Sequence, residues 1–145
     1  MKKYFTASLI SLLMSCSFDK TYENREEDKN DAQKITKKFY NFMQEGNSEG
    51  VFKLFSNNFF QVTSKEKLSR VINKTENEYG KIQSDSLSNW RTHISEGSNP
   101  VSKYEMTYQV KRETGKTQEV ITLQKENDTI RIIGYRIDFD IVSQK

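Results

Sequence analysis

The chain has one cysteine, one histidine and one proline among its 145 residues. A lone Cys16 excludes a disulfide within the chain, and a lone His93 cannot join a second imidazole in a metal cluster or a catalytic triad. Glycine-rich phosphate loops and the common motifs of zinc, calcium and serine-hydrolase sites are also missing. The sequence therefore predicts a protein that is not an enzyme and that uses no cofactor.

The charge of the chain is nearly balanced once its first residues are set aside. Two of the 23 basic residues, Lys2 and Lys3, fall within residues 1–15, so the rest of the chain carries 21 basic against 20 acidic side chains. Phosphate-backbone binding needs clustered Lys and Arg, so the sequence predicts no nucleic-acid partner. Hydrophobic content is only 34%, but 12% aromatic residues supply enough buried area for one packed domain.

The first sixteen residues have the layout of an export signal. Two lysines precede an apolar run over residues 4–14, and the run ends at Ser15-Cys16. This run is shorter than the ~20 residues that a membrane-spanning helix needs. Residues 13–16 resemble the bacterial lipobox, in which the peptide bond before the cysteine is cleaved and the thiol receives diacylglycerol. The alternative is an ordinary secretory signal, or a small amphipathic anchor, in which the cysteine occurs by chance.

This resemblance implies a lipoprotein with residues 1–15 as signal peptide and Cys16 as the lipidated residue. The acylated cysteine would hold the protein on a lipid bilayer in the bacterial cell envelope, at the outer membrane if the cell has two membranes. Residues 16–30 are then the lipidated cysteine and a flexible tether, because the stretch is charged and lacks a helical stripe. Fully extended, its last fourteen residues reach about 45 Å. The acidic triplet at 26–28 has an alternative interpretation as an address for the cell surface.

Apolar spacing predicts three helical segments in the first half of the domain. The first begins at residues 30–31, carries apolar side chains at spacings of three and four, and ends at Gly46. A short second segment over 51–55 follows a polar turn. The third opens at Thr63 with a capping-box pattern and ends at Gly80.

The period then changes from 3.6 to 2, which predicts an antiparallel sheet. Strands are expected over 101–112, 117–126 and 129–142, joined by short turns. A further strand, bent or interrupted, is expected between residues 81 and 94. Together these elements predict an α+β fold in which N-terminal helices pack on a curved antiparallel β-sheet, in one domain over residues 31–145.

The order of elements resembles the nuclear transport factor 2-like, or cystatin-like, cone. The stretches that carry this resemblance are FYNFMQEGNSEGVFKLFS, the step from Tyr79 to Ile82, and VITLQKENDTIRIIGYRI. They are similar to small uncharacterised bacterial lipoproteins of that superfamily. The resemblance implies a sheet curled around the first helix, with a mouth that holds a small molecule or is buried in a dimer. Enzymes among such proteins place Asp, His or Tyr inside the cone.

Aromatic side chains mark the candidate ligand site. Tyr104 and Tyr108 share one face of the strand over 101–112, so a pocket on that face would have phenols to orient a ligand. Tyr135 on the last strand belongs to the same region, and Trp90 is a residue type in which binding energy concentrates. The alternative is that all four side chains simply pack in the core.

Three titratable side chains are the candidates for catalysis. Asp138 and Asp140 lie two apart in a strand and so share a face, either as a pair for acid-base work or in solvent, which is the simpler interpretation. The opposite face, with Ile133 and Ile137, is the better core face. His93 is expected near a strand end and exposed.

The sequence thus predicts a membrane-anchored envelope lipoprotein that acts as a non-catalytic module. It would bind a small apolar ligand in the cone or dock an envelope protein. One alternative is a homodimeric structural or interaction protein without a ligand. The other, less favoured, is a small cone-fold enzyme that uses Asp138, Asp140 or His93.

Overall fold

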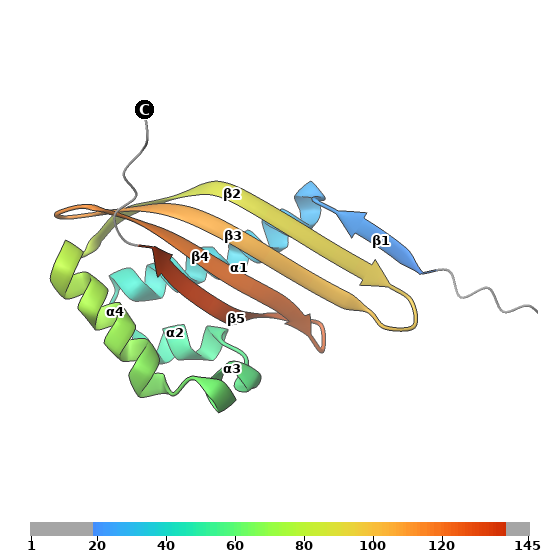
Figure 1. Cartoon of the computed structure of the whole chain (residues 1–145), viewed down its shortest axis with the longest axis horizontal. Helices are drawn as coiled ribbons and strands as arrows, with labels where there is room; N and C mark the ends of the chain where they lie inside the picture. Colours follow the sequence, from blue (N-terminus) through green and yellow to red (C-terminus); the bar gives the residue numbers. More distant parts are fainter. Residues whose placement is uncertain (1–18, 139–145) are drawn as a thin grey trace, which may run out of the picture.

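The computed structural model describes residues 19–138, so the predicted signal peptide, Cys16 and Asp140 lie outside the described residues. The fold is α+β, with helices followed by a curved, open antiparallel sheet in the order β1-β2-β3-β4-β5 (Figure 1). The helices are α1 Glu26–Gln44, α2 Ser48–Leu54, α3 Asn57–Val62 and α4 Lys65–Tyr79. The strands are β1 Lys20–Glu23, β2 Ile82–Glu96, β3 Val101–Arg112, β4 Lys116–Glu126 and β5 Thr129–Asp138. No helix within 19–138 is long and apolar enough to cross a membrane.

The N-terminal part of the domain differs from the predicted tether. Lys20–Glu23 form a strand on the edge of the sheet, and α1 begins at Glu26 instead of residues 30–31. Asn24 makes the turn between them at φ 51°, with its amide donating to the Thr92 carbonyl and its side chain accepting from the Thr92 amide, both at 3.0 Å. The prediction of a flexible tether is therefore wrong for residues 19–30, which belong to the folded domain.

The acidic triplet at 26–28 explains why the helix starts early. These three carboxylates occupy the first turn of α1, where the positive end of the helix dipole stabilises negative charge. The N-cap residue is Arg25, whose side chain makes no capping hydrogen bond. It instead forms a 2.7 Å ion pair with Asp28 one turn on. The triplet therefore stabilises the first turn of α1.

The other helix ends agree with the sequence more closely. Gly46, at φ 68°, follows the end of α1, and Gly80, at φ 77°, ends α4, as predicted. The cap of α4 is Ser64, not Thr63, because the Ser64 hydroxyl accepts from the Lys67 amide. Helix α3 was not predicted, since its aromatic run has no clear helical period.

Register shifts explain why the period of β2 was hard to follow. The pairing of β2 with β3 shifts between Ile82 and Ser84 and again between Leu87 and Asn89. Each shift inserts one residue, so that Ile82, Leu87 and Trp90 all stay on the inner face. The expectation of a bent or interrupted strand between 81 and 94 is confirmed.

A third shift changes which isoleucine of β5 is buried. The β4–β5 pairing shifts between Thr122 and Leu123, and Ile132 is fully buried whereas Ile133 is only half-buried. The prediction of Ile133 as a core residue is wrong, because alternation along β5 restarts after the bulge. Tyr135 and Ile137 return to the inner face beyond it.

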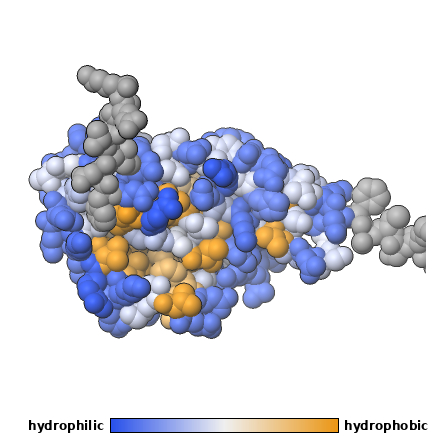
Figure 2. Space-filling model, in the orientation of Figure 1, coloured by the Kyte–Doolittle hydropathy of each residue, from blue (hydrophilic) through white to orange (hydrophobic). Residues whose placement is uncertain are grey.

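The core lies between the inner face of the sheet and α1. Phe39 and Tyr40 of α1 are buried against the sheet, and their rings meet Tyr135 and Tyr108 edge-on at centroid distances of 5.1 and 5.0 Å. Helices α2, α3 and α4 gather beyond β5 (Figure 1). Figure 2 shows patches of hydrophobic surface, framed by hydrophilic residues, over β5 and these helices.

Candidate functional site

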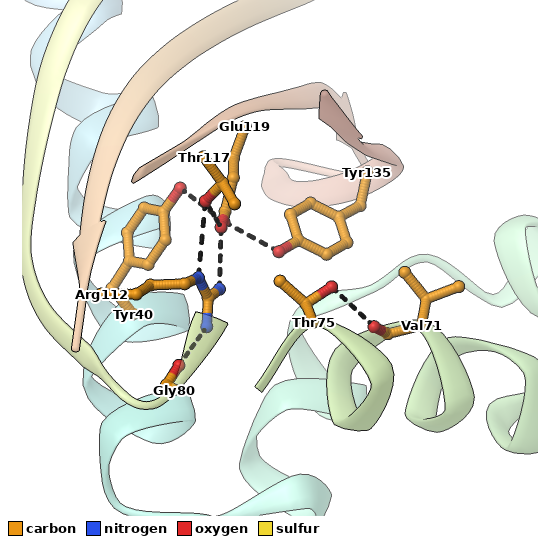
Figure 3. Close-up of polar contacts among 8 residues, drawn as sticks. All are labelled: Tyr40, Val71, Thr75, Gly80, Arg112, Thr117, Glu119 and Tyr135. Carbon is orange, nitrogen blue, oxygen red and sulfur yellow. Dashed lines mark hydrogen bonds and ion pairs between the residues drawn. The ribbon is translucent and has the colours of Figure 1, made fainter. Parts of the chain in front are cut away.

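A buried charged cluster joins three strands to α1 near the turn between β3 and β4. Arg112 Nη2 on β3 donates to Glu119 Oε1 on β4 over 2.8 Å, and the two side chains are 2% and 0% exposed. The Thr117 hydroxyl donates to the same carboxylate oxygen over 2.9 Å, and Arg112 also donates to the carbonyl of Gly80 (Figure 3). We call the carboxylate and its partners the glutamate cluster.

Two tyrosines complete the glutamate cluster on the other carboxylate oxygen. Glu119 Oε2 accepts from the hydroxyls of Tyr135 at 2.8 Å and Tyr40 at 3.2 Å (Figure 3). Burial, and then the nearby carboxylate, raise the pKa of both phenols well above its ordinary value. The phenols thus stay protonated donors, and every carboxylate oxygen is satisfied within the protein.

Two of the predicted ligand tyrosines, Tyr108 and Tyr135, make hydrogen bonds and ring contacts within the protein. The Tyr108 hydroxyl lies 2.5 Å from that of Thr36, and its ring packs on Tyr40. Tyr135 bonds Glu119 and packs on Phe39. These aromatic rings occupy the space in which an internal ligand was expected to sit.

Trp90 and Tyr104 lie elsewhere, so the structure does not bring the four predicted residues into one pocket. Trp90 is half-buried on β2 with Lys29 Nζ of α1 at 5.3 Å from its ring centroid. Tyr104 is 4% exposed and forms part of the wall of a groove described below. Of the four predicted residues, Tyr104 is therefore the one that lines this groove.

Asp85 is a further acidic group on the inner face, which sequence reasoning missed. It pairs with Val110 across the β2–β3 ladder and is half-buried. Loss of solvation, and then repulsion from Glu119, raise the pKa of the Asp85 carboxyl, while Lys37 opposes this rise. A charged residue at an alternate strand position that otherwise carries core side chains is the signal that would have identified both Glu119 and Asp85.

An open groove, which we call the mouth groove, lies between the first half of α1 and the ends of four strands, β2 to β5. Its volume is about 800 Å³. Its apolar walls come from Ile35, Ile94, Tyr104 and Ile130, together with Pro100. Apolar walls of this kind offer contact area to a bound molecule but do not specify its orientation.

The rim of the mouth groove carries charges of both signs in adjacent pairs. Three ion pairs border it: Arg25 with Asp28, Lys34 with Asp31, and Lys125 with Asp128. The last two are exposed, and exposed pairs contribute only about 0–1 kcal/mol each. A bound molecule with charges of its own can therefore exchange with them at little cost. Sequence reasoning missed this rim because the tether prediction included Arg25 and Asp28.

A second groove lies beside the short helices. It has a volume of about 530 Å³ and combines phenylalanine rings with basic side chains. Lys65 Nζ lies 5.3 Å from the ring centroid of Phe52 and 5.9 Å from that of Phe60. Arg131 donates to the backbone carbonyl of Lys53 at its border. These internal contacts already engage both cations.

The two described candidates for catalysis, His93 and Asp138, are not part of the lining of either groove. His93 lies on β2, half-exposed, with its ring against the carboxylate of Glu23 on β1. Asp138 forms a 3.2 Å ion pair with Arg136 on the outer face of β5. Within residues 19–138 no group of three or more His, Cys, Asp or Glu side chains is arranged to hold a metal ion.

No family model matches the chain, and comparison with curated proteins and with solved structures finds no match. A function for the chain is therefore proposed from the geometry of the domain and from the sequence around Cys16. The glutamate cluster is closed to solvent, whereas the mouth groove is open and bordered by exchangeable charges.

Proposed function

We propose that this protein is a lipid-anchored component of the bacterial cell envelope that acts as a non-catalytic binding module on a cystatin-like cone. The lipobox-like residues 13–16 support acylation of Cys16. The curved five-stranded sheet with α1 across its inner face supports the cone. Acyl chains on the cysteine would keep the folded domain on the bilayer.

The mouth groove is the proposed binding surface, and its open, charged rim is the observation that carries the proposal. Paired charges of both signs around apolar walls suit a polar chain with charges of its own, such as a segment of another envelope protein. They suit a small apolar ligand less well, because such a ligand leaves the rim charges without new partners. The interior, where the ligand was first expected, is filled by Tyr108, Tyr135 and Tyr40.

The burial and the ion pairs of the titratable side chains support the proposal that the protein is not an enzyme. Glu119 is fully buried, with both oxygens engaged by protein donors, so no substrate can reach it without rupture of the core. His93 and Asp138 lie on different strands and each has an ionic partner. None of these groups faces a groove.

A photo-crosslinking amino acid at position 38 tests the mouth groove in intact cells. Lys38 is exposed on the groove, and Lys67 on α4 is also exposed but lies outside it, which makes it a matched control. We expect one discrete covalent adduct from position 38 and none from position 67. An adduct of twice the chain mass would identify the occupant as a second copy. Equal adducts from both positions, or none from either, would contradict the proposal.

A further inference from the structure

The folded domain begins almost at the proposed lipid anchor. Asp19, the first described residue, accepts a 3.1 Å hydrogen bond from the Ser98 amide in the turn between β2 and β3. Gly97 makes this approach possible, since a Cβ there would lie 1.8 Å from the Asp19 carboxylate, and its φ is 139°. The chain is thus held against the sheet from residue 19 onward.

Strand β1 continues this attachment without a break. Lys20 pairs with Glu96 and Glu23 with His93 in the antiparallel ladder, and the Glu23 side chain contacts the His93 ring. Beyond the strand, Arg25 stacks over the Tyr22 ring at 4.1 Å. These contacts fix the direction in which the chain enters the domain.

The linker between the proposed anchor and the domain is too short to let the domain move far from the bilayer. Only Ser17 and Phe18 separate Cys16 from Asp19. Three residue steps span at most about 11 Å, even when fully extended. The sheet is much longer, because the 12 residues of β3 extend about 40 Å. The end of the sheet that carries Asp19 is therefore held at the bilayer, while the length of the sheet allows its opposite end to stand clear of it.

We infer that the domain rests directly on the lipid surface through one end of its sheet, formed by Asp19, Lys20 and residues 96–100, which are the last residue of β2 and the turn after it. We call this the membrane end. The inference rests on the proposed acylation of Cys16. Figure 1 shows the membrane end opposite the β3–β4 turn and α4, which then point away from the bilayer.

The chemistry of the membrane end suits lipid headgroups more than hydrocarbon. Lys20, Glu96, Ser98 and Asn99 are all exposed and polar. Polar groups of this kind form hydrogen bonds with headgroups and water, whereas their transfer into the acyl region is costly. The domain therefore lies on the bilayer and does not insert.

This orientation also restricts what can reach the mouth groove. Glu96 and Pro100 belong both to the membrane end and to the groove lining. The groove thus opens beside the headgroups, and its occupant must approach along the bilayer surface. A partner that is itself membrane-bound is favoured over one that diffuses freely, since both are then held in the same layer.

Site-directed labels on the acylated full-length protein test the orientation. Because Cys16 carries lipid, an Asn99→Cys or Lys116→Cys variant has a single free thiol for a fluorophore. Residue 99 lies in the membrane end, and residue 116 lies at the opposite end of the sheet. The proteins are reconstituted into phosphatidylcholine vesicles with and without headgroup spin-labelled lipid, a quencher. We expect quenching several-fold stronger at position 99 than at position 116.

A variant with a longer linker between Cys16 and the domain is the control. Twelve Gly and Ser residues inserted between Ser17 and Phe18 add a random-coil distance of about 20 Å, which should abolish the difference between the two labels. Equal quenching in the unmodified, acylated protein would overturn the orientation and leave the anchor intact. An intact mass that lacks acyl chains on Cys16 would overturn the anchor itself, and the orientation with it.

Discussion

Arg112 and Glu119 form an ion pair of 2.8 Å that is almost completely withdrawn from water, with side chains 2% and 0% exposed. Burial of such a pair removes two charges from water, which is unfavourable. It is tolerated here because Thr117, Tyr40 and Tyr135 donate hydrogen bonds to the remaining acceptor positions of the carboxylate. The pair connects β3 with β4 and, through the phenols, with α1 and β5. We regard it as the element that fixes the arrangement of the core.

The first prediction follows from this burial. Glu119→Gln should lower the free energy of unfolding by about 3–5 kcal/mol, because the charge of Arg112 is left buried without a partner. Combined with Arg112→Met, the loss should be smaller than the sum of the two single losses, with a coupling energy above about 1 kcal/mol. Urea unfolding of the four proteins gives the cycle. Strictly additive losses would mean that the pair does not act as a unit.

The second prediction compares two threonines of equal burial. Thr92 is 1% exposed, and its hydroxyl has no hydrogen-bond partner in the part of the chain that the structure describes. Thr92→Val should therefore leave stability unchanged or raise it by about 1 kcal/mol. Thr36→Val is the matched control, and it should cost about 1–3 kcal/mol because the Tyr108 hydroxyl loses one of its hydrogen-bond partners. Equal losses in both variants would show that Thr92 has a partner after all.

The third prediction concerns alkaline pH. Burial raises the pKa of Tyr104 and Tyr108, and raises that of Tyr40 and Tyr135 further. The unfolded phenols ionise near pH 10, so the stability gained from the protonated forms is complete below about pH 10 and is lost as pH rises through the folded pKa values. Phenolate absorbance should therefore appear late and together with unfolding.

The control for the alkaline transition removes two phenols. In a Tyr40→Phe, Tyr135→Phe double variant the alkaline loss of stability should be smaller, although the variant is less stable at neutral pH because Glu119 loses two donors. Titration of every tyrosine of the native protein near pH 10, before unfolding, would contradict the burial of these phenols.

The fourth prediction addresses the attachment of β1. Gly97→Ala should displace Asp19, because its Cβ would overlap the Asp19 carboxylate and the backbone at φ 139° disfavours a side chain. Amide hydrogen exchange should then show loss of protection in β1 with little change in β3 and β4, at a cost of about 1–3 kcal/mol to local stability. An unchanged β1 would contradict a chain fixed from residue 19.

Much of the sheet was predictable, because alternation over β3 and β4 is regular and the turns between strands carry suitable residues. The register shifts of β2 and β5 were not, since a bulge depends on the partner strand and leaves only an irregular period. They decided that Ile132 and not Ile133 enters the core. The early start of α1 was hidden for a related reason, because its first turn is stabilised by charge and by contacts with β2 instead of apolar spacing.

The candidate site was less predictable than the fold. Tyr104 was identified from its strand face, but whether a tyrosine lines a groove or fills a core depends on what α1 places opposite it. Tyr108 meets Thr36 and Tyr40, whereas Tyr104 lies beside the open rim. The rim charges of Arg25 and Asp28 are set by the turn at Asn24, which comes from long-range pairing with Thr92. Single-sequence patterns carry little information about such pairings.

The intact mass of the protein extracted from the membranes of its cells tests the central claim most directly. We predict a chain that begins at Cys16 and carries the added mass of diacylglycerol on its thiol. This result would establish the anchor from which the orientation of the domain and the position of its mouth groove follow. A chain that begins at another residue, or a Cys16 with a free thiol, would contradict the account.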